Sequence, residues 1–206
     1  MAETPQEFYD RVVAASTDGR LPVPSSVTDS EIFPFETEGL RVRPLSPPVL
    51  PEPPRAGEEG GAPCARCALG EEQALWGDER WLLVPPGEPV GLPFAALLMP
   101  REHLDFGELD GGLAAELGRL LVAIERAVKT LDGVARVHVN IWGDGGEHLH
   151  VWFLARPLGL LQLRGSCLPD WLDLLPARPA EDVAADQRAV VDALVVSYGG
   201  HSLIDQ

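Results

Sequence analysis

Residues 134–157 read VARVHVNIWGDGGEHLHVWFLARP, and the periodicity of this stretch decides the fold class. Apolar residues alternate with polar or aromatic residues on both sides of the GDGG run at residues 143–146. Strict alternation is typical of a half-buried β-strand, and a glycine-rich run between two such stretches is typical of a hairpin turn. We therefore predict two antiparallel strands, at residues 134–142 and 147–155, joined by this turn.

The alternation assigns the side chains of the two predicted strands to two faces. The apolar face carries Val137, Val139, Ile141, Leu149, Val151 and Phe153. The opposite face carries His138, Asn140, Trp142, His148, His150 and Trp152. With a turn centred on Gly145, Asn140 is predicted to lie opposite His150. A single histidine on a strand is most often structural, but two histidines and an asparagine beside a glycine turn favour a functional site.

The flanking sequence predicts the rest of an α+β domain. Short strands at residues 72–76 and 80–84 flank a Gly77-Asp78 turn, and the apolar run FAALLM at residues 94–99 is typical of a buried strand. Apolar residues recur at steps of three and four over residues 110–131, which predicts one long amphipathic helix. We expect an antiparallel β-meander with this helix packed on one face, an N-terminal extension, and a C-terminal helix at residues 182–197.

Composition divides the chain of 206 residues into three parts. Residues 1–60 are expected to be an N-terminal extension, with a weak helical pattern at residues 5–16 and a short strand at residues 40–42. The extension ends in a run rich in proline, glycine and glutamate, which cannot bury a core and is interpreted as a linker or mobile loop. Residues 61–160 are expected to form the compact domain, and residues 161–206 a tail that contains the last helix.

The chain is strongly acidic, with 32 Asp and Glu against 16 Lys and Arg and a net charge of −16. A field of this sign repels phosphate backbones and anionic lipids, which argues against nucleic acid and membranes as partners. No apolar run is long enough for a membrane helix, and the first ten residues are too polar for a signal peptide. With an odd number of cysteines, these features predict a protein of the reducing cytoplasm.

Cys64 and Cys67 form a C-A-R-C motif, whose two thiolates can reach one tetrahedral zinc ion. Two further ligands are available from His103 in the sequence PREH and from His148 at the start of HLHVW. A redox pair is the alternative. However, a redox motif of this type opens a helix after a strand, whereas this motif follows a proline- and glycine-rich run. Cys167 is interpreted as an unpaired thiol.

Four pieces of the chain, in this order, resemble the histidine triad (HIT) superfamily, which includes nucleotide hydrolases and the galactose-1-phosphate uridylyltransferases. They are C-A-R-C, the strand ending in P-R-E-H, the long helix, and the block VNIWGDGGEHLHVWFLARP. The resemblance covers residues 64–157 and implies an antiparallel sheet and a homodimer. It implies zinc bound by the residues that match the zinc-containing branches, which are Cys64, Cys67, His103 and His148. It also implies that His150 is the nucleophile and that Asn140 holds the phosphate.

One position departs from the pattern of this family. The third position of the histidine block is histidine in most of its hydrolases and glutamine in the uridylyltransferases, and it is Trp152 here. An indole has one N–H donor, no acceptor and no proton that it can give to a leaving group. We expect Trp152 to stack on a base or a sugar, or to pack inside the domain.

We therefore expect a HIT-like nucleotide hydrolase or nucleotidyltransferase, in which His150 attacks the α-phosphate of a nucleotide derivative to form a nucleotidyl-histidine intermediate. Asn140 and the backbone N–H groups of Gly145 and Gly146 are expected to bind phosphate oxygens. The zinc is expected to be structural, since four protein ligands leave no position open for water. The alternative is a zinc-stapled nucleotide-binding protein with weak or no catalysis, which Trp152 favours and the pair of His150 and Asn140 disfavours.

Overall fold

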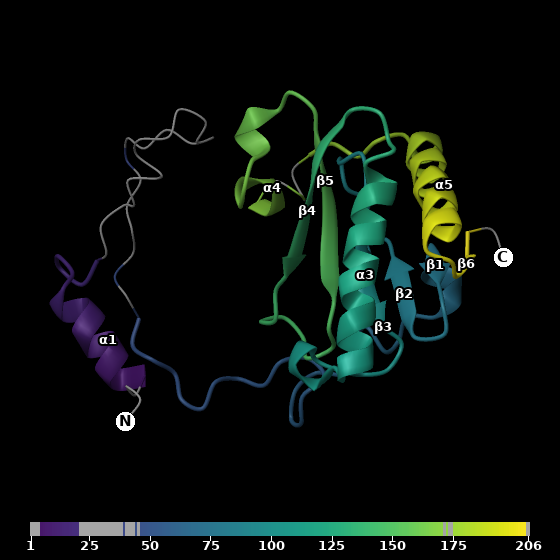
Figure 1. Cartoon of the computed structure of the whole chain (residues 1–206). Helices are drawn as coiled ribbons and strands as arrows, with labels where there is room; N and C mark the ends of the chain where they lie inside the picture. The colour runs from purple at the N-terminus through teal and green to yellow at the C-terminus, as the bar shows by residue number, and fades with distance from the viewer. Residues whose placement is uncertain are drawn as a thin grey trace. The chain divides into compact units, whose positions relative to one another are not determined.

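The computed structural model describes residues 5–20, 39, 44, 46–170, 172 and 175–204 of the chain (Figure 1). Contacts divide the chain into two units, Met1–Pro53 and Pro54–Gln206. In the first unit the described residues form α1 (Pro5–Ala14), where a helical pattern is expected. The strand expected at residues 40–42 lies outside the described residues. The domain limits at residues 60 and 160 stay predictions.

The second unit is built on a six-stranded antiparallel sheet with the strand order β4-β5-β3-β2-β1-β6. The strands are β1 (Trp76–Gly77), β2 (Trp81–Val84), β3 (Ala95–Pro100), β4 (Val134–Ile141), β5 (Val151–Pro157) and β6 (His201–Ser202). The first three strands are consecutive neighbours, as in a meander. The β4-β5 hairpin then joins the sheet through β5, which leaves β4 at the edge. This sheet and its helices confirm the predicted α+β class.

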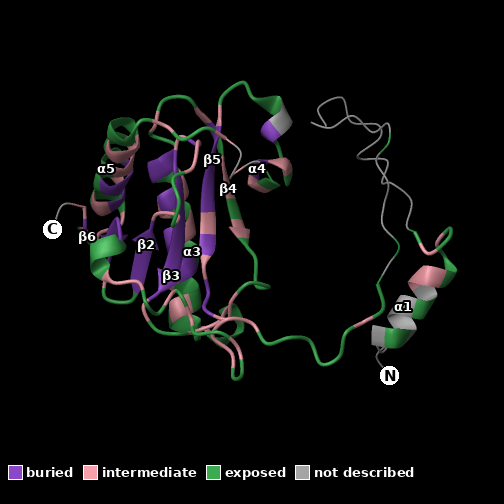
Figure 2. Cartoon of the chain, turned by 180° about the vertical axis from the view of Figure 1, so that it is seen from behind, coloured by how far each residue is buried: buried purple, intermediate pink, exposed green. Residues whose placement is uncertain are grey.

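Two long helices, α3 (Gly111–Val128) and α5 (Ala180–Ser197), cover one face of the sheet (Figures 1 and 2). The side chain of Asp110 caps α3 by accepting a hydrogen bond from the Leu113 N–H at 2.7 Å. The apolar stripe of α3 packs with strand residues such as Phe153 and with Leu194 of α5 in the largest hydrophobic cluster. The helix expected at residues 110–131 is therefore present and buries the expected face.

Shorter segments pack on the opposite face of the sheet. There Leu154 of β5 packs with Leu163 from η3 (Leu161–Leu163) and with Leu168 from α4 (Cys167–Asp170). The stretch expected as a first strand at residues 72–76 is mostly not a strand, because η1 (Glu71–Gln73) occupies its beginning. None of the described helices combines the length and the apolar character needed to cross a membrane.

The predicted register of the β4-β5 hairpin is wrong by two residues. Asn140 lies opposite Trp152, not His150, and β5 begins at Val151. The reason is non-local pairing. The Glu147 N–H donates to the Ala56 carbonyl at 2.9 Å, and the Leu149 N–H donates to the Leu104 carbonyl at 2.8 Å. Residues 147–150 therefore pair with other segments and not with β4.

The buried face of α3 predicts a large difference between two substitutions on the same helix. Ile124 is fully buried in the main core, whereas Val122 is 48% exposed. We expect Ile124→Ala to lower the free energy of unfolding by about 2–5 kcal/mol, because it removes buried methyl groups and leaves a cavity. Val122→Ala should change it by no more than about 0.5 kcal/mol. Urea unfolding followed by circular dichroism measures both, and equal losses would contradict this assignment of the helix face.

Candidate functional site

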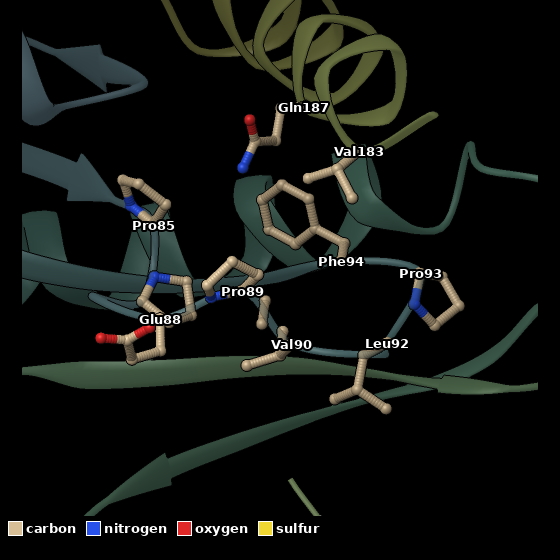
Figure 3. Close-up of a pocket in the computed structure, with 11 residues that line it drawn as sticks. Pro85, Glu88, Pro89, Val90, Leu92, Pro93, Phe94, Val183 and Gln187 are labelled. Atoms are coloured by element: carbon tan, nitrogen blue, oxygen red, sulfur yellow. The ribbon is translucent and has the colours of Figure 1, made fainter. Parts of the chain in front are cut away.

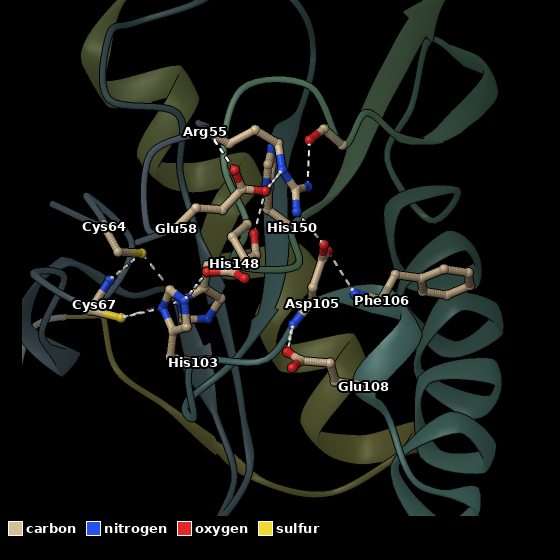
Figure 4. A network of polar contacts seen from close by, with 12 residues as sticks. Arg55, Glu58, Cys64, Cys67, His103, Asp105, Phe106, Glu108, His148 and His150 are labelled. Carbon is tan, nitrogen blue, oxygen red and sulfur yellow. Dashed lines mark hydrogen bonds and ion pairs between the residues drawn. The ribbon is translucent and has the colours of Figure 1, made fainter. Parts of the chain in front are cut away.

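Four side chains from three segments converge at one end of the second unit (Figure 4). Cys64 and Cys67 lie on the turn that precedes η1, His103 follows β3, and His148 precedes β5. Their ligand atoms all lie within 4.8 Å of one another. The structure therefore brings together the four residues that the sequence proposes as zinc ligands, although they span 84 positions between Cys64 and His148.

The distances within this cluster suit a tetrahedral zinc ion. The His148 Nδ1 lies 3.6 Å from the Cys64 Sγ and 3.4 Å from the Cys67 Sγ, and the His103 Nδ1 lies 3.1 Å from the Cys67 Sγ. Typical zinc–sulfur and zinc–nitrogen bonds at a tetrahedral angle place sulfur and nitrogen about 3.6 Å apart. All three cysteines of the chain are free thiols, and Cys167 lies outside the cluster.

The far nitrogen of each clustered histidine is held by an oxygen. The His148 Nε2 lies 2.9 Å from the Pro100 carbonyl, and the His103 Nε2 lies 3.1 Å from the Glu147 carboxylate. An oxygen partner at Nε2 keeps the proton there, so Nδ1 is free to bind a metal. Burial also lowers the pKa of His148, which favours its neutral, ligating form. The sequence analysis did not identify Glu147 as the partner of His103. In the sequence, only its position next to His148 could have indicated such a role.

The imidazole of His150 is held by a backbone carbonyl. Its Nδ1 lies 2.8 Å from the His148 carbonyl, an acceptor that places the proton on Nδ1. The lone pair is then on Nε2. His150 lines a cleft of about 250 Å³ together with Ala56, Cys64, Ala65, Arg66, Gly145, Gly146 and His148. The His150 side chain, the glycine turn and the turn that carries Cys64 therefore line one cavity.

Asn140 and Trp152 face each other across the β4-β5 hairpin. The Asn140 Nδ2 is buried and has no hydrogen-bond partner among the described residues. Trp152 is partly buried against two hydrophobic clusters, and its ring centroid lies 6.4 Å from that of Trp142. Trp152 thus packs inside the domain, which is one of the two roles expected for it. A buried amide N–H without a partner is costly, so an oxygen atom bound at the Asn140 Nδ2 would lower the free energy of this face.

The segment before the turn that carries Cys64 and Cys67 is bonded to the glycine turn (Figure 4). We call its Arg55, with the partners Glu58 and Asp105, the clamp. Arg55 pairs with Glu58 at 2.6 Å and with Asp105 at 2.8 Å, and its third nitrogen donates to the Gly143 carbonyl at 2.8 Å. Ala56 pairs with Gly146 in a short parallel bridge. Residues 54–62, expected to belong to a linker, therefore pack against the glycine turn, and Ala56 of this segment lines the cleft. The sequence analysis missed Arg55, because only its distant partners show its role.

The charges of this clamp stabilise one another. The hydrogen bond from Arg55 lowers the pKa of Glu58. Partial burial raises the pKa of Asp105, but the hydrogen bonds from Arg55 and from the Phe106 N–H outweigh it, and the pKa is lowered. Both carboxylates in turn raise the pKa of Arg55. All three groups are charged near neutral pH, so both ion pairs of the clamp are formed there.

Two further polar residues of the β4-β5 hairpin lie outside the cleft. Arg156 is buried and donates to the Pro157 and Leu160 carbonyls, which is a structural role. His138 is hydrogen-bonded to the Gly165 backbone, and burial and the charge of Arg156 lower its pKa. A second cavity, of about 60 Å³, is lined by proline and apolar residues such as Phe94 and Val183 (Figure 3). Its lining residues include no histidine and no cysteine, so it offers neither an imidazole nor a thiol.

No protein-family model and no curated protein matches this chain. Solved structures that are similar to it are histidine triad proteins. One from Bradyrhizobium japonicum is 21% identical, with a TM-score of 0.48 over 59% of this chain and 89% of that chain. A zinc-bound histidine triad family protein from Mycobacterium smegmatis is 19% identical, with a TM-score of 0.43 over 60% and 84%. A hypothetical histidine triad nucleotide-binding protein from Sulfolobus tokodaii is 18% identical, with a TM-score of 0.46 over 68% and 99%.

The cluster predicts the metal content of the purified protein. We expect one zinc ion per chain, because two thiolates and two imidazole nitrogens complete a tetrahedral site. Cys67→Ser should lose most of the zinc, and Cys167→Ser is the matched control that should retain it. Elemental analysis of dialysed protein measures both variants. Zinc retained by Cys67→Ser, or absent from the wild type, would contradict the assignment.

The clamp predicts a local change in hydrogen exchange. Arg55→Ala removes the pairs with Glu58 and Asp105, so we expect the Glu147 N–H, which donates to Ala56, to exchange faster. Arg119→Ala is the control, because Arg119 is 60% exposed and 4.0 Å from its carboxylate partner. Amide exchange followed by NMR measures the difference between the two variants.

The ion pairs of the same clamp should be lost in acid. Its carboxyl groups have lowered pKa values in the folded protein, so their contribution is present above their ordinary pKa values and is lost as the pH falls through the lowered ones. In that acidic range the Glu147 N–H of the wild type should be protected no more than in Arg55→Ala. Protection that stays higher in the wild type in acid would show that the ion pairs do not hold the segment.

Proposed function

We propose that this chain is a histidine triad-type nucleotide hydrolase or nucleotidyltransferase, and that His150 is its nucleophile. The observation that carries the proposal is the hydrogen bond between the His150 Nδ1 and the His148 carbonyl. This bond leaves a lone pair on Nε2 at a cleft whose other wall is the glycine turn. A neutral imidazole with a fixed tautomer is a competent nucleophile near neutral pH.

The reaction proceeds in two displacements at phosphorus. The His150 Nε2 attacks the α-phosphorus of a nucleotide derivative, the Nε2–P bond forms, and the bond from phosphorus to the leaving group breaks with its electron pair going to the leaving group. Water, or the hydroxyl or phosphate of an acceptor, then attacks the same phosphorus. The P–N bond breaks, one proton is released from the attacking group, and His150 returns to its neutral state.

Two kinds of N–H donor are available for the phosphate oxygens. The Asn140 Nδ2 is a buried N–H group without a partner among the described residues, and a phosphate oxygen would satisfy it. The backbone N–H groups of Gly145 and Gly146 line the cleft and supply further donors. They would stabilise the negative charge that develops on the oxygens during each displacement.

Cys64, Cys67, His103 and His148 would hold a zinc ion with all four of its positions filled by protein. Such an ion is structural and supplies no water for the reaction. His148 would link the two sites, because its imidazole would bind the ion and its carbonyl orients His150. Ligation by two free thiols suits the reducing cytoplasm, where we propose that the protein acts, in keeping with its three free cysteines.

One observation favours the alternative, a zinc-stapled nucleotide-binding protein with little or no catalysis. Trp152 stands where the family carries a third imidazole or an amide, and it packs against two hydrophobic clusters. None of the residues that line the cleft carries a carboxyl group that could protonate the leaving group. A binding protein would tolerate the loss of the His150 imidazole, whereas an enzyme would not. A homodimer is a further proposal, carried by the resemblance alone.

The decisive experiment compares two histidine-to-alanine variants on a panel of substrates. The panel contains a nucleoside phosphoramidate, a dinucleoside polyphosphate, and a nucleotide sugar with a sugar phosphate as acceptor. His150→Ala should lose at least about 1,000-fold in kcat, since it removes the nucleophile. His201→Ala, whose histidine is exposed in β6, is the control that should keep full turnover.

A covalent intermediate gives a second readout that a purely structural role would not produce. Brief incubation with a substrate labelled at the α-phosphorus should label the wild type through an acid-labile P–N bond, and should not label His150→Ala. Turnover that survives in His150→Ala would refute the proposed nucleophile. Nucleotide and zinc bound by a wild type that turns over no substrate would establish the binding protein.

A further inference from the structure

We propose that Arg66 binds the anionic leaving group of the substrate, so that this site selects nucleotide derivatives whose α-phosphate is bonded to a second phosphate group. The inference rests on the proposed function, since it takes His150 as the group that meets the α-phosphate. It adds a specificity-determining residue that belongs to neither the nucleophile nor the metal-ligand set.

The first observation is the place of Arg66 in the cleft. It lines the same cavity of about 250 Å³ as His150 and the glycine pair Gly145 and Gly146. The eight lining residues all lie in the described part of the chain, and Arg66 is the one among them that carries a permanent charge. Its side chain is half-buried. An anion that reaches the His150 Nε2 therefore meets one fixed positive charge in the cavity.

The second observation is that this cation has no carboxylate partner. Acidic residues outnumber basic ones by 32 to 16 in this chain, and the arginines around the cleft are paired: Arg55 with Glu58 and Asp105, and Arg101 with Glu71. Within the described ranges no carboxylate forms an ion pair with Arg66. A half-buried guanidinium without a carboxylate partner is suited to an anion site, because its partial desolvation is compensated when the anion binds.

The third observation is that the backbone at Arg66 is fixed from both sides. Arg66 stands between Cys64 and Cys67, which both belong to the metal-ligand cluster. The Cys67 N–H lies 3.4 Å from the Cys64 Sγ, and the Arg66 carbonyl accepts a hydrogen bond from the Leu69 N–H at 3.1 Å. The turn that would bind the metal therefore also fixes the backbone that carries the Arg66 side chain.

The chemistry explains why such a cation is needed here. When the His150 Nε2 attacks the α-phosphorus, the bridging P–O bond breaks and its electron pair goes to the oxygen of the departing group. Trp152 offers no proton for that oxygen. A departing phosphate is a weak base and needs no proton, but the charge that it gains must be stabilised. Arg66 supplies that charge, and its planar fork matches two phosphate oxygens.

The test is equilibrium binding of the mono- and diphosphates of adenosine, guanosine and uridine, measured by calorimetry. Arg66→Gln should raise the Kd for the diphosphates roughly 10- to 100-fold, the range expected for a hydrogen bond to a charged group. The Kd for the monophosphates should change little, since they present only the α-phosphate. Arg66→Lys, which keeps the charge without the fork, should restore part of the affinity. Arg119→Gln is the matched control for removal of an exposed charge.

Zinc is quantified in each variant, and Arg66→Lys keeps the test valid where Arg66→Gln loses metal. The same proteins are then assayed on a dinucleoside polyphosphate and on the 4-nitrophenyl ester of a nucleoside monophosphate. Arg66→Gln should slow the first reaction and leave the second, whose leaving group carries no phosphate, nearly unchanged.

Three results would overturn the inference: equal losses for mono- and diphosphates, no loss for either, or no nucleotide binding by the wild type. Diphosphate binding that depends on Arg66, in a protein without turnover, would support the anion site and refute the proposed catalysis. The two proposals therefore fail separately.

Discussion

Two imidazole nitrogens that face two sulfur atoms constrain the whole functional end of this molecule. The four ligand atoms lie within 4.8 Å of one another although they come from three separate segments. The turn before η1, the end of β3 and the approach to β5 must meet at this point. Three other features of the site adjoin this cluster. They are the carbonyl that holds His150, the cleft that His150 lines, and the side chain of Arg66.

Two histidines that share one face of the chain before β5 have different surroundings. His148 is 2% exposed and points its Nδ1 into the cluster, while His150 is half-buried and lines the cleft. The carbonyl of the first histidine fixes the tautomer of the second. The backbone of His148 therefore links the position of the clustered imidazole to that of the imidazole in the cleft.

Electrostatics at the site run against the net charge of the chain. Arg55 is paired with two carboxylates, those of Glu58 and Asp105, and these ion pairs hold the segment that precedes Cys64. Arg66 has no such partner among the described residues and faces the place where substrate charge would change. A local cation in an acidic protein favours a small anion and still repels a polyanion, because the far field is set by the net charge and the near field by one side chain.

The sequence by itself determined the local elements and the residue types of the site. Alternation placed Val151 and Phe153 on the core face, periodicity of three and four residues defined α3, and the chemistry of thiols and imidazoles selected the four clustered ligands. These patterns are local, or depend on residue type alone, so they can be read without knowing which segments meet. The tertiary structure decided which residues are paired. Asn140 lies opposite Trp152 because Glu147 and Leu149 bond to Ala56 and Leu104, and Arg55 joins its segment to Asp105 and Gly143. Such contacts join residues tens of positions apart, and their energies depend on packing that no periodicity encodes.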